Sequence, residues 1–598
     1  MKKAILFLFF FVALASVAVG QNETDWFKTR WLAPANGEIK FPATGSGYTI
    51  RYVPINHVTG APIGAMQTIS PASSGQVISG LTAGWTYRID AYGGTFNQFN
   101  FSSFSNNRLD IVRVEQWGTT VWSSFLSAFW YCENLDVTAT DIPNLSACTN
   151  MRSMFQGCTK LVNGNGSISG WQTANVTNMS SMFYGATSFN QPIGNWQTAN
   201  VTDMSSMFYG ATAFNQPLNW NTQNVTNMSY MFQRATAFNQ LLNWNTQNVT
   251  NMGAMFSGAS SFNQPLNWNT TNVTDMGAMF YGATAFNQPL NWNTANVTNM
   301  GYMFREATAF NQPLNWNTQN VTSMRGMFYG ATAFNGDVNS WGNKVKNVMT
   351  IEDMFNGATS FNHSLEDWVL KAGVNTGNAF VGTGIDCHNL TVTLEGWAKN
   401  SEYAFFDDYE ARKPYIPQIF SISFSSPYGY KAKHLAEYLM AYKRIYVYLS
   451  YKGYIPDRNG TEEATGYILE IDSRRNATGA ATPTNRQVNI NVVGTNFSAK
   501  YAEIGNPSNT GTVTGLNTGS AITLPSPGKY TITVYAPDGG SITALSTTTA
   551  PLTNGYITNI AQWGTTKWQS LKDAFKGCTG LTYISAFDVP NLSGCTSL

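Results

Sequence analysis

Charged residues are scarce in this chain. They make up 11% of its 598 residues, whereas an ordinary soluble domain carries about 25%. The 34 Lys and Arg residues nearly balance the 33 Asp and Glu residues, so the net charge is +1. Electrostatic binding of nucleic acid needs clustered Lys and Arg, which the long Asn- and Thr-rich middle of the chain lacks. The composition therefore argues against a nucleic-acid partner.

Long hydrophobic runs are missing after the N-terminus. A basic start and an apolar run from Ala4 to Val19 are typical of a Sec signal peptide. The small residues Ala18 and Gly20 place cleavage before Gln21, so we assign residues 1–20 to the signal peptide. We expect an exported protein, secreted or at the cell surface. No later window offers the ~20 apolar residues of a membrane helix, so we do not expect an integral membrane protein in this region.

Motifs for catalysis and metal binding are missing as well. The four His residues are scattered, and the six Cys residues form no CxxC pair, so the sequence does not indicate a zinc site. No HExxH, GxSxG or Walker motif occurs, which removes the common signatures of hydrolases and nucleotide-binding proteins. The repeats described next hold few titratable side chains and are a poor host for acid–base catalysis. We therefore expect no enzyme, no catalytic, metal-binding or cofactor-binding residues, and no cofactor.

The sequence is dominated instead by a repeat of 24 or 25 residues. The copy that starts at Asn224 reads NVTNMSYMFQRATAFNQLLNWNTQ, and near copies begin at positions 175, 200, 248, 272, 296 and 320. Degenerate copies extend the array, which we place at residues 117–385. Such repetition predicts units that stack, because one unit cannot bury its own apolar face.

Each repeat predicts a short helix followed by a short strand. Met228, Met231, Phe232 and Ala235 have the i, i+3, i+4, i+7 spacing of one helix face. Residues 218–221 alternate between apolar and polar side chains, as a strand does. The predicted fold is therefore an α+β repeat solenoid of ~24-residue units, leucine-rich-repeat-like, with methionine as core filler.

The repeated Asn and Trp residues each allow two interpretations. The Asn of each Asn-Val-Thr is either an N-glycosylation acceptor or part of a ladder that bonds the backbone of neighbouring turns. The Trp that recurs from Trp196 to Trp316 is either a core residue or part of a stacking platform for sugars. The alternation favours inward Trp and outward Asn. The candidate ligand-facing positions are Asn219, Asn221, Asn243, Asn245, Asn267, Asn269, Asn291, Asn293, Asn315 and Asn317.

Cys132 and Cys158 occupy the small-residue position of adjacent repeats. If these repeats lie one strand spacing apart, the separation suits a disulfide, which an exported protein is able to keep. Two buried free thiols are the alternative.

Segments of different texture flank the array. Residues 21–116 contain period-two runs separated by Gly, Pro and Ser, which predict a small antiparallel, β-sandwich-like domain. Residues 386–475 predict an α/β cap, which a terminal repeat needs. Residues 476–560 predict a second β-domain, and QWGTTKW at 562–568 nearly copies QWGTTVW at 116–122. Residues 561–598 are therefore predicted to start a second, truncated solenoid.

The repeat sequence NVTDMSSMFYGATAFNQPLNWNT at 200–222 resembles the surface-protein repeats of the BspA-like leucine-rich repeat family, the mycoplasma-type repeat also described as domain of unknown function 285. EQWGTTVW at 115–122 and TLEGWAKN at 393–400 are similar to segments that accompany such arrays in Bacteroidetes-type proteins. The resemblance implies an exported cell-surface or secreted protein with a leucine-rich-repeat-like solenoid, similar in some members to adhesins for host matrix proteins. It implies no catalytic residues.

Two functions remain open at this point. The first is non-catalytic adhesion to, or recognition of, an extracellular protein partner. The second is a glycan-binding surface that uses the repeated Asn and Trp positions. Exposed Trp side chains would favour the second function, whereas buried ones would remove its main support.

Overall fold

A computed structural model gives the structure of the chain. It describes residues 22–399 except 105, 106 and 165. Beyond these it describes residues 420–424, 435–436, 439, 445–449, 467–472, 487–489, 492–504, 506–518, 520–526, 528–536, 541–545, 557–562 and 583–584. The chain divides into two compact units, residues 1–268 and 269–598, and each is described by itself. The predicted signal peptide lies outside the described residues.

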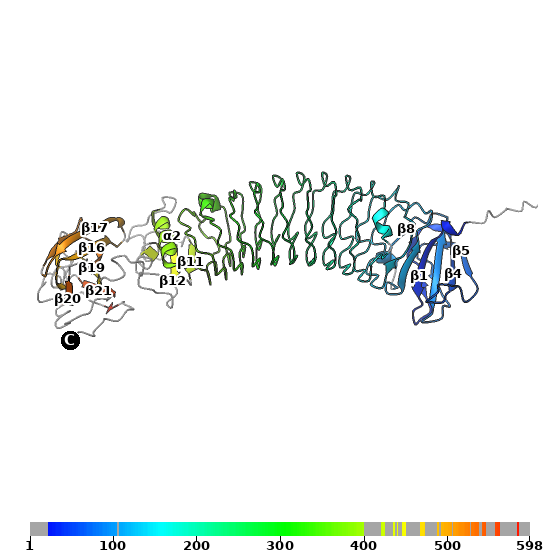
Figure 1. The fold of residues 1–598 in the computed structure, drawn as a ribbon, viewed down its shortest axis with the longest axis horizontal. Helices are drawn as coiled ribbons and strands as arrows, with labels where there is room; N and C mark the ends of the chain where they lie inside the picture. The colour runs from blue at the N-terminus through cyan, green and yellow to red at the C-terminus, as the bar shows by residue number, and fades with distance from the viewer. Residues whose placement is uncertain are drawn as a thin grey trace, which may run out of the picture. The chain divides into compact units, whose positions relative to one another are not determined.

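The first unit begins with a six-stranded sheet (Figure 1) of order β10-β9-β1-β7-β4-β5. Its strands are β1 (Phe27–Leu32), β4 (Ser46–Pro54), β5 (Gln67–Ser73), β7 (Thr86–Tyr92), β9 (Ile111–Gln116) and β10 (Asp136–Val137). Every neighbouring pair is antiparallel except β9 and β10, which are parallel. Two small pairs, β2 (Ile39–Lys40) with β6 (Val77–Ile78) and β3 (Ala43–Thr44) with β8 (Gln98–Phe99), complete the strands of this domain. Its helical turns are η1 (Glu23–Asp25) and α1 (Phe101–Phe104).

The core of this sheet continues into the first repeats. The fully buried ring of Phe27 on β1 lies 5.3 Å from the ring of Phe99, and 5.8 and 5.0 Å from the rings of Trp117 and Trp122. Phe99 in turn lies 5.4 Å from Phe129. Strand β10 belongs to the predicted array in sequence and to the sheet in space. Sheet and first repeats therefore share one aromatic core.

The predicted helix-plus-strand unit is wrong. Between η2 (Ser167–Gly170) and η3 (Asn339–Val345) the repeats contain no helix and no strand, although all residues of this stretch are described. Within each unit, Figure 1 draws the repeats as turns stacked on one another. Single-residue parallel bridges join neighbouring repeats, as between Asn178 and Asp203 in the first unit and between Asp275 and Asn299 in the second.

Hydrogen bonds between repeats explain why no helix forms. The amides of Met228, Tyr230, Phe232 and Arg234 donate over 2.7–3.0 Å to carbonyls of the next repeat, while the amides between them close turns within their own repeat. A helix would keep all these amides inside the segment. Tyr230 and Arg234 have φ of 59° and 58°, a left-handed conformation that a right-handed helix excludes. Successive turns therefore produce the apolar spacing that we expected from a helix.

We call the part of each repeat that carries these turns, residues 228–235 in the copy that starts at Asn224, the turn segment. The alternation predicted after each turn segment is present without a β-strand. Leu218 and Trp220 are buried, whereas Asn219 and Asn221 are exposed. Leu, Trp, Met and Phe of successive repeats together form the core of the stack. The glycines at 185, 210 and 282 have positive φ, which glycine adopts without steric cost.

In the second unit α2 (Cys387–Lys399) follows the repeats. Its Trp397 donates from Nε1 to the carbonyl of Leu365 over 3.0 Å, as Trp368 does to the carbonyl of Val338 over 2.9 Å. Trp397 therefore takes the position that a repeat Trp would have in one further repeat. At this position the backbone is helical, whereas in the preceding repeats it is irregular. β11 (Phe420–Phe424) pairs in parallel with β12 (Ile445–Leu449).

The second unit also contains a six-stranded sheet, of order β17-β16-β19-β13-β21-β22. Its strands are β13 (Tyr467–Asp472), β16 (Phe497–Glu503), β17 (Asn506–Leu516), β19 (Lys529–Tyr535), β21 (Ile557–Gln562) and β22 (Tyr583–Ile584). Two small pairs again accompany it, β14 (Gln487–Asn489) with β18 (Ala521–Thr523) and β15 (Val492–Thr495) with β20 (Ser541–Leu545).

The two sheets have the same topology. Taken in chain order, their strands occupy the same places, and the last pair is parallel in both. Both also have an irregular register between the first strand and the strand that leads into the QWGTT sequence, which we call the QWGTT-leading strand. It is β9 in the first sheet and β21 in the second. The repeated sequence therefore reflects a duplicated fold. Strand β13 belongs to the second sheet, so this sheet begins before residue 476.

Candidate interaction surfaces

The Asn residues that open the repeats form a ladder. Asn200, Asn224 and Asn248 donate from Nδ2 to carbonyls of the preceding repeat over 2.7–2.8 Å, and in the second unit Asn320 does the same. A second set, which includes Asn190 and Asn215, accepts backbone and side-chain amides of the next repeat. These side chains hold the stack together, which supports the ladder interpretation of Asn-Val-Thr.

The repeat Trp residues are core residues. In the first unit Trp220 and Trp244 are 4% and 6% exposed, and their rings lie 6.2 Å apart, nearly parallel. Each donates from Nε1 to a carbonyl of the preceding repeat, as Trp244 does to Leu218 over 3.0 Å. The Trp rings therefore do not form an exposed platform for sugars.

Half of the ten candidate Asn positions have side chains that form no hydrogen bond to any residue that the structure describes. We call Asn219, Asn243 and Asn267 of the first unit the amide row. All three are exposed and, among the described residues, have no hydrogen-bonding partner for their side chains. Asn291 and Asn315 are the exposed equivalents in the second unit. The other five accept a backbone amide two residues ahead through Oδ1, and these are Asn221, Asn245, Asn269, Asn293 and Asn317.

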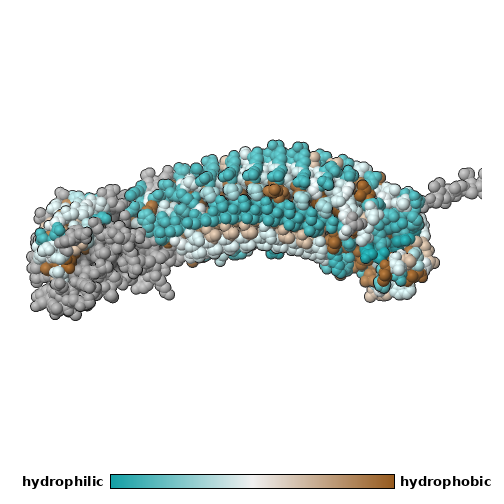
Figure 2. Space-filling view, in the orientation of Figure 1, coloured by the Kyte–Doolittle hydropathy of each residue, from teal (hydrophilic) through white to brown (hydrophobic). Residues whose placement is uncertain are grey.

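A groove of about 560 Å³ lies beside the amide row. Asn219 and Asn243 line it together with Pro217, Leu241 and Trp220, and none of its lining residues is charged. Leu241 is 54% exposed and stands where the neighbouring repeats have proline. On the face drawn in Figure 2 the repeats show bands of hydrophilic residues.

The second unit carries a different surface on its turn segments, the tyrosine–arginine cluster, formed by Tyr281, Tyr302, Arg305, Arg325 and Tyr329. The guanidinium of Arg305 lies 4.1 Å from the ring centroid of Tyr329 and 5.7 Å from those of Tyr281 and Tyr302. Arg325 lies 5.9 Å from the ring of Tyr302. Both arginine side chains remain partly exposed, at 29% and 46%. The attraction between each guanidinium and the neighbouring tyrosine rings helps to hold both cations in place.

Acidic side chains balance this cluster. Glu306 pairs with Arg305 over 3.3 Å, and Glu352 pairs with Arg325 over 2.9 Å.

In the first unit Tyr184 and Tyr209 occupy the position after the repeat Phe, as Tyr281 and Tyr329 do in the second unit, and their ring centroids lie 4.3 Å apart. Partial burial and the neighbouring Tyr209 raise the pKa of Tyr184.

Sequence reasoning missed the tyrosine–arginine cluster, although a signal was present. The position after the repeat Phe varies, whereas the amide-row position is Asn in every copy that begins between residues 200 and 296. The varied residues are Tyr184, Tyr209, Gln233, Ser257, Tyr281, Arg305 and Tyr329. Variation among otherwise near-identical repeats marks the side chains that the stacking does not dictate.

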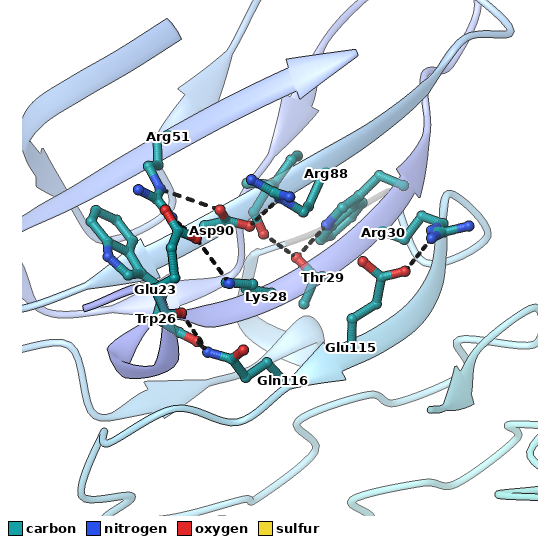
Figure 3. A network of polar contacts seen from close by, with 12 residues as sticks. Glu23, Trp26, Lys28, Thr29, Arg30, Arg51, Arg88, Asp90, Glu115 and Gln116 are labelled. Carbon is teal, nitrogen blue, oxygen red and sulfur yellow. Dashed lines mark hydrogen bonds and ion pairs between the residues drawn. The ribbon is translucent and has the colours of Figure 1, made fainter. Parts of the chain in front are cut away.

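An ion network on the first sheet (Figure 3) is structural. Buried Asp90 pairs with Arg51 and Arg88, each over 3.2 Å. Glu23 accepts from Arg51 over 2.7 Å and from Lys28 over 3.0 Å. Hydrogen bonds from Arg51 and then Lys28 lower the pKa of Glu23 to about 2, whereas burial raises the pKa of Asp90. The network links β1, β4 and β7 with the N-terminal turn.

The structure shows Cys132 and Cys158 as buried free thiols. Cys158 donates from Sγ to the carbonyl of Phe129 over 3.1 Å. Burial raises the pKa of both thiols, so the reactive thiolate is disfavoured. Of the two alternatives that the sequence left open for this pair, the structure therefore shows the buried free thiols and not the disulfide.

The described residues provide no cluster of three or more His, Cys, Asp or Glu side chains for a metal ion. Within the same residues, no helix has the length and apolar character needed to span a membrane.

These features define a class of protein in which short repeats stack into a core and display free side chains along their turns. Residues 123–240, 218–291 and 290–392 match the family described as Mycoplasma protein of unknown function, DUF285. The chain is thus similar to this repeat family over most of its array. No curated protein and no solved structure matches the chain.

Proposed function

We propose that this is an exported, cell-surface or secreted repeat protein that recognises an extracellular protein partner without catalysis. The tyrosine–arginine cluster is the observation that carries the proposal. Tyr and Arg are enriched at protein–protein interfaces and among the residues that dominate binding energy. The resemblance to BspA-like surface proteins, some of which are similar to adhesins, supports the same conclusion.

The geometry of the cluster favours a protein partner. Arg305 is already held by Tyr329 and Glu306, so binding immobilises little additional side-chain freedom. The side chains differ from repeat to repeat. A partner with an aperiodic surface, such as a folded protein, requires this variation, whereas a regular polymer does not.

Binding of the full chain to immobilised fibronectin, fibrinogen, laminin and collagen tests the proposal. We expect binding to at least one of them, weakened about tenfold or more by the double variant Arg305→Ala/Tyr329→Ala. The double variant Asn291→Ala/Asn315→Ala in the same unit is the matched control and should bind normally. Absence of binding to all four proteins, or equal binding by both variants, would contradict the proposal.

Export is a separate part of the proposal, supported by the basic start and apolar run of residues 1–19. Expression in a Sec-competent bacterium followed by N-terminal sequencing should find mature protein that starts at Gln21. Protein retained in the cytoplasm with Met1 intact would oppose it.

A further inference from the structure

The amide row differs from the other repeated polar rows because its side chains are not used by the stack. Among the described residues, Asn219, Asn243 and Asn267 have exposed side chains without hydrogen-bonding partners. The opening Asn residues, in contrast, donate to the preceding repeat. Stack stability therefore does not account for an Asn at this position in successive copies.

The chemistry of the row and its groove is neutral. A carboxamide both donates and accepts hydrogen bonds, which matches sugar hydroxyls, since these also do both. The groove beside Asn219 and Asn243 has no charged lining residue, so it offers no ion pair to a phosphate, a sulfate or a uronate. Exposed Leu241 and Pro217 provide apolar surface for the C–H face of a sugar ring.

The periodicity of the row points to a periodic ligand. The same free amide recurs in three successive repeats, whose adjacent Trp rings lie 6.2 and 6.3 Å apart. This distance is comparable with the length of one pyranose unit. A linear polysaccharide that runs along the stack would present hydroxyls to the row at a regular spacing, whereas an aperiodic protein surface would not.

We propose that the amide row and its groove bind a neutral linear polysaccharide. The exposed indole platform considered from the sequence plays no part, because the Trp rings are buried. This site does not depend on the tyrosine–arginine cluster or on a protein partner.

Affinity electrophoresis of the full chain through gels that contain xylan, mannan, soluble cellulose derivatives without charge, or dextran tests the proposal. We expect retardation by at least one neutral polysaccharide. The triple variant Asn219→Ala/Asn243→Ala/Asn267→Ala should weaken this binding about tenfold or more, because several hydrogen bonds are lost together. Leu241→Ser should also weaken it.

Matched controls separate binding from folding. The triple variant should keep the thermal midpoint of the unmodified chain, since its side chains are free, and Arg305→Ala/Tyr329→Ala should bind the polysaccharide normally. Retardation by none of the neutral polymers, equal retardation by alginate or heparin, or unchanged binding of the triple variant would each overturn the proposal.

Discussion

At the scale of single residues, Leu241 differs from the residue that the neighbouring repeats have at its position. The stability of the stack does not require a leucine there. The preceding and following repeats have Pro217 and Pro265 at this position, so the backbone there accommodates a proline. Leu241→Pro should raise the free energy of unfolding by about 0.5–1 kcal/mol, because proline reduces the freedom of the unfolded chain.

Thermal and urea unfolding monitored by circular dichroism measure this effect. Leu241→Ser is the control, because it removes the same exposed side chain without fixing the backbone, and it should not stabilise the protein. A lower midpoint for the proline variant would show that the backbone at residue 241 differs from that of its neighbours.

Glu23 gives the first sheet a specific dependence on pH. Hydrogen bonds from Arg51 and Lys28 lower its pKa from 4.5 to about 2 in the folded protein. Its stabilising contribution is therefore complete above pH 4.5 and is lost as the pH falls toward 2. Because the Glu23 side chain is 60% exposed, we expect only about 1 kcal/mol or less. Asp90, with a raised pKa, has the opposite dependence.

Comparison with Glu23→Gln isolates this contribution from that of Asp90. The unmodified chain should be more stable than the variant at pH 6, and the difference should shrink steadily as the pH falls from 4.5 toward 2. A constant difference across this range, measured by urea unfolding of the first sheet, would rule out titration of Glu23 as its cause.

At the scale of elements, the turn segments of successive repeats have complementary side chains. Gly326 has φ of 55°, and a Cβ at this position would lie 2.7 Å from the ring of Tyr302 in the preceding repeat. Gly326→Ala should destabilise the protein by about 1–2 kcal/mol, because a left-handed alanine costs energy and the ring must move.

A matched pair of variants separates these two causes. Gly330 has φ of 64°, but its added Cβ would meet only Glu306 Cγ at an ordinary 3.5 Å, so Gly330→Ala reports the backbone cost alone. Gly326→Ala should cost more than Gly330→Ala, and the excess should vanish in a Tyr302→Ala background. An excess that persists in this background would show that the two segments do not pack against each other.

The turn segment also shows where prediction from sequence succeeds and fails. Period-two alternation correctly predicted buried Trp220 and exposed Asn219, because burial follows from the side on which a side chain lies. The helix was wrong because two successive turns place Met228, Met231 and Phe232 on one side with helical spacing. Only bonds to the next repeat distinguish the two structures. The varied position after the repeat Phe marks some members of the tyrosine–arginine cluster in the sequence. Their proximity was beyond prediction, because only stacking brings together residues of different repeats.

At the scale of the whole molecule, both six-stranded sheets end in a parallel pair formed by the QWGTT-leading strand and a short strand that follows it. In the first unit this short strand is part of the array, and the rings of Phe27, Phe99, Trp117 and Trp122 form one cluster. A stack of repeats needs its terminal apolar face covered. We therefore interpret the first sheet as the N-terminal cap of the array as well as a domain.

The ring of Phe27 tests this dual role. Phe27→Ala should destabilise the first sheet by about 3–5 kcal/mol, because it removes a fully buried ring from a packed core. Hydrogen exchange followed by mass spectrometry should show faster exchange in β1 and also in residues 117–135. Repeats from residue 200 onward should be little affected, since coupling in stacked repeats is mainly between neighbours. Tyr530→Ala, which removes a fully buried ring of the second sheet, is the matched control and should leave exchange in residues 117–135 unchanged. Faster exchange in β1 alone would mean that the sheet folds independently of the repeats and does not cap them.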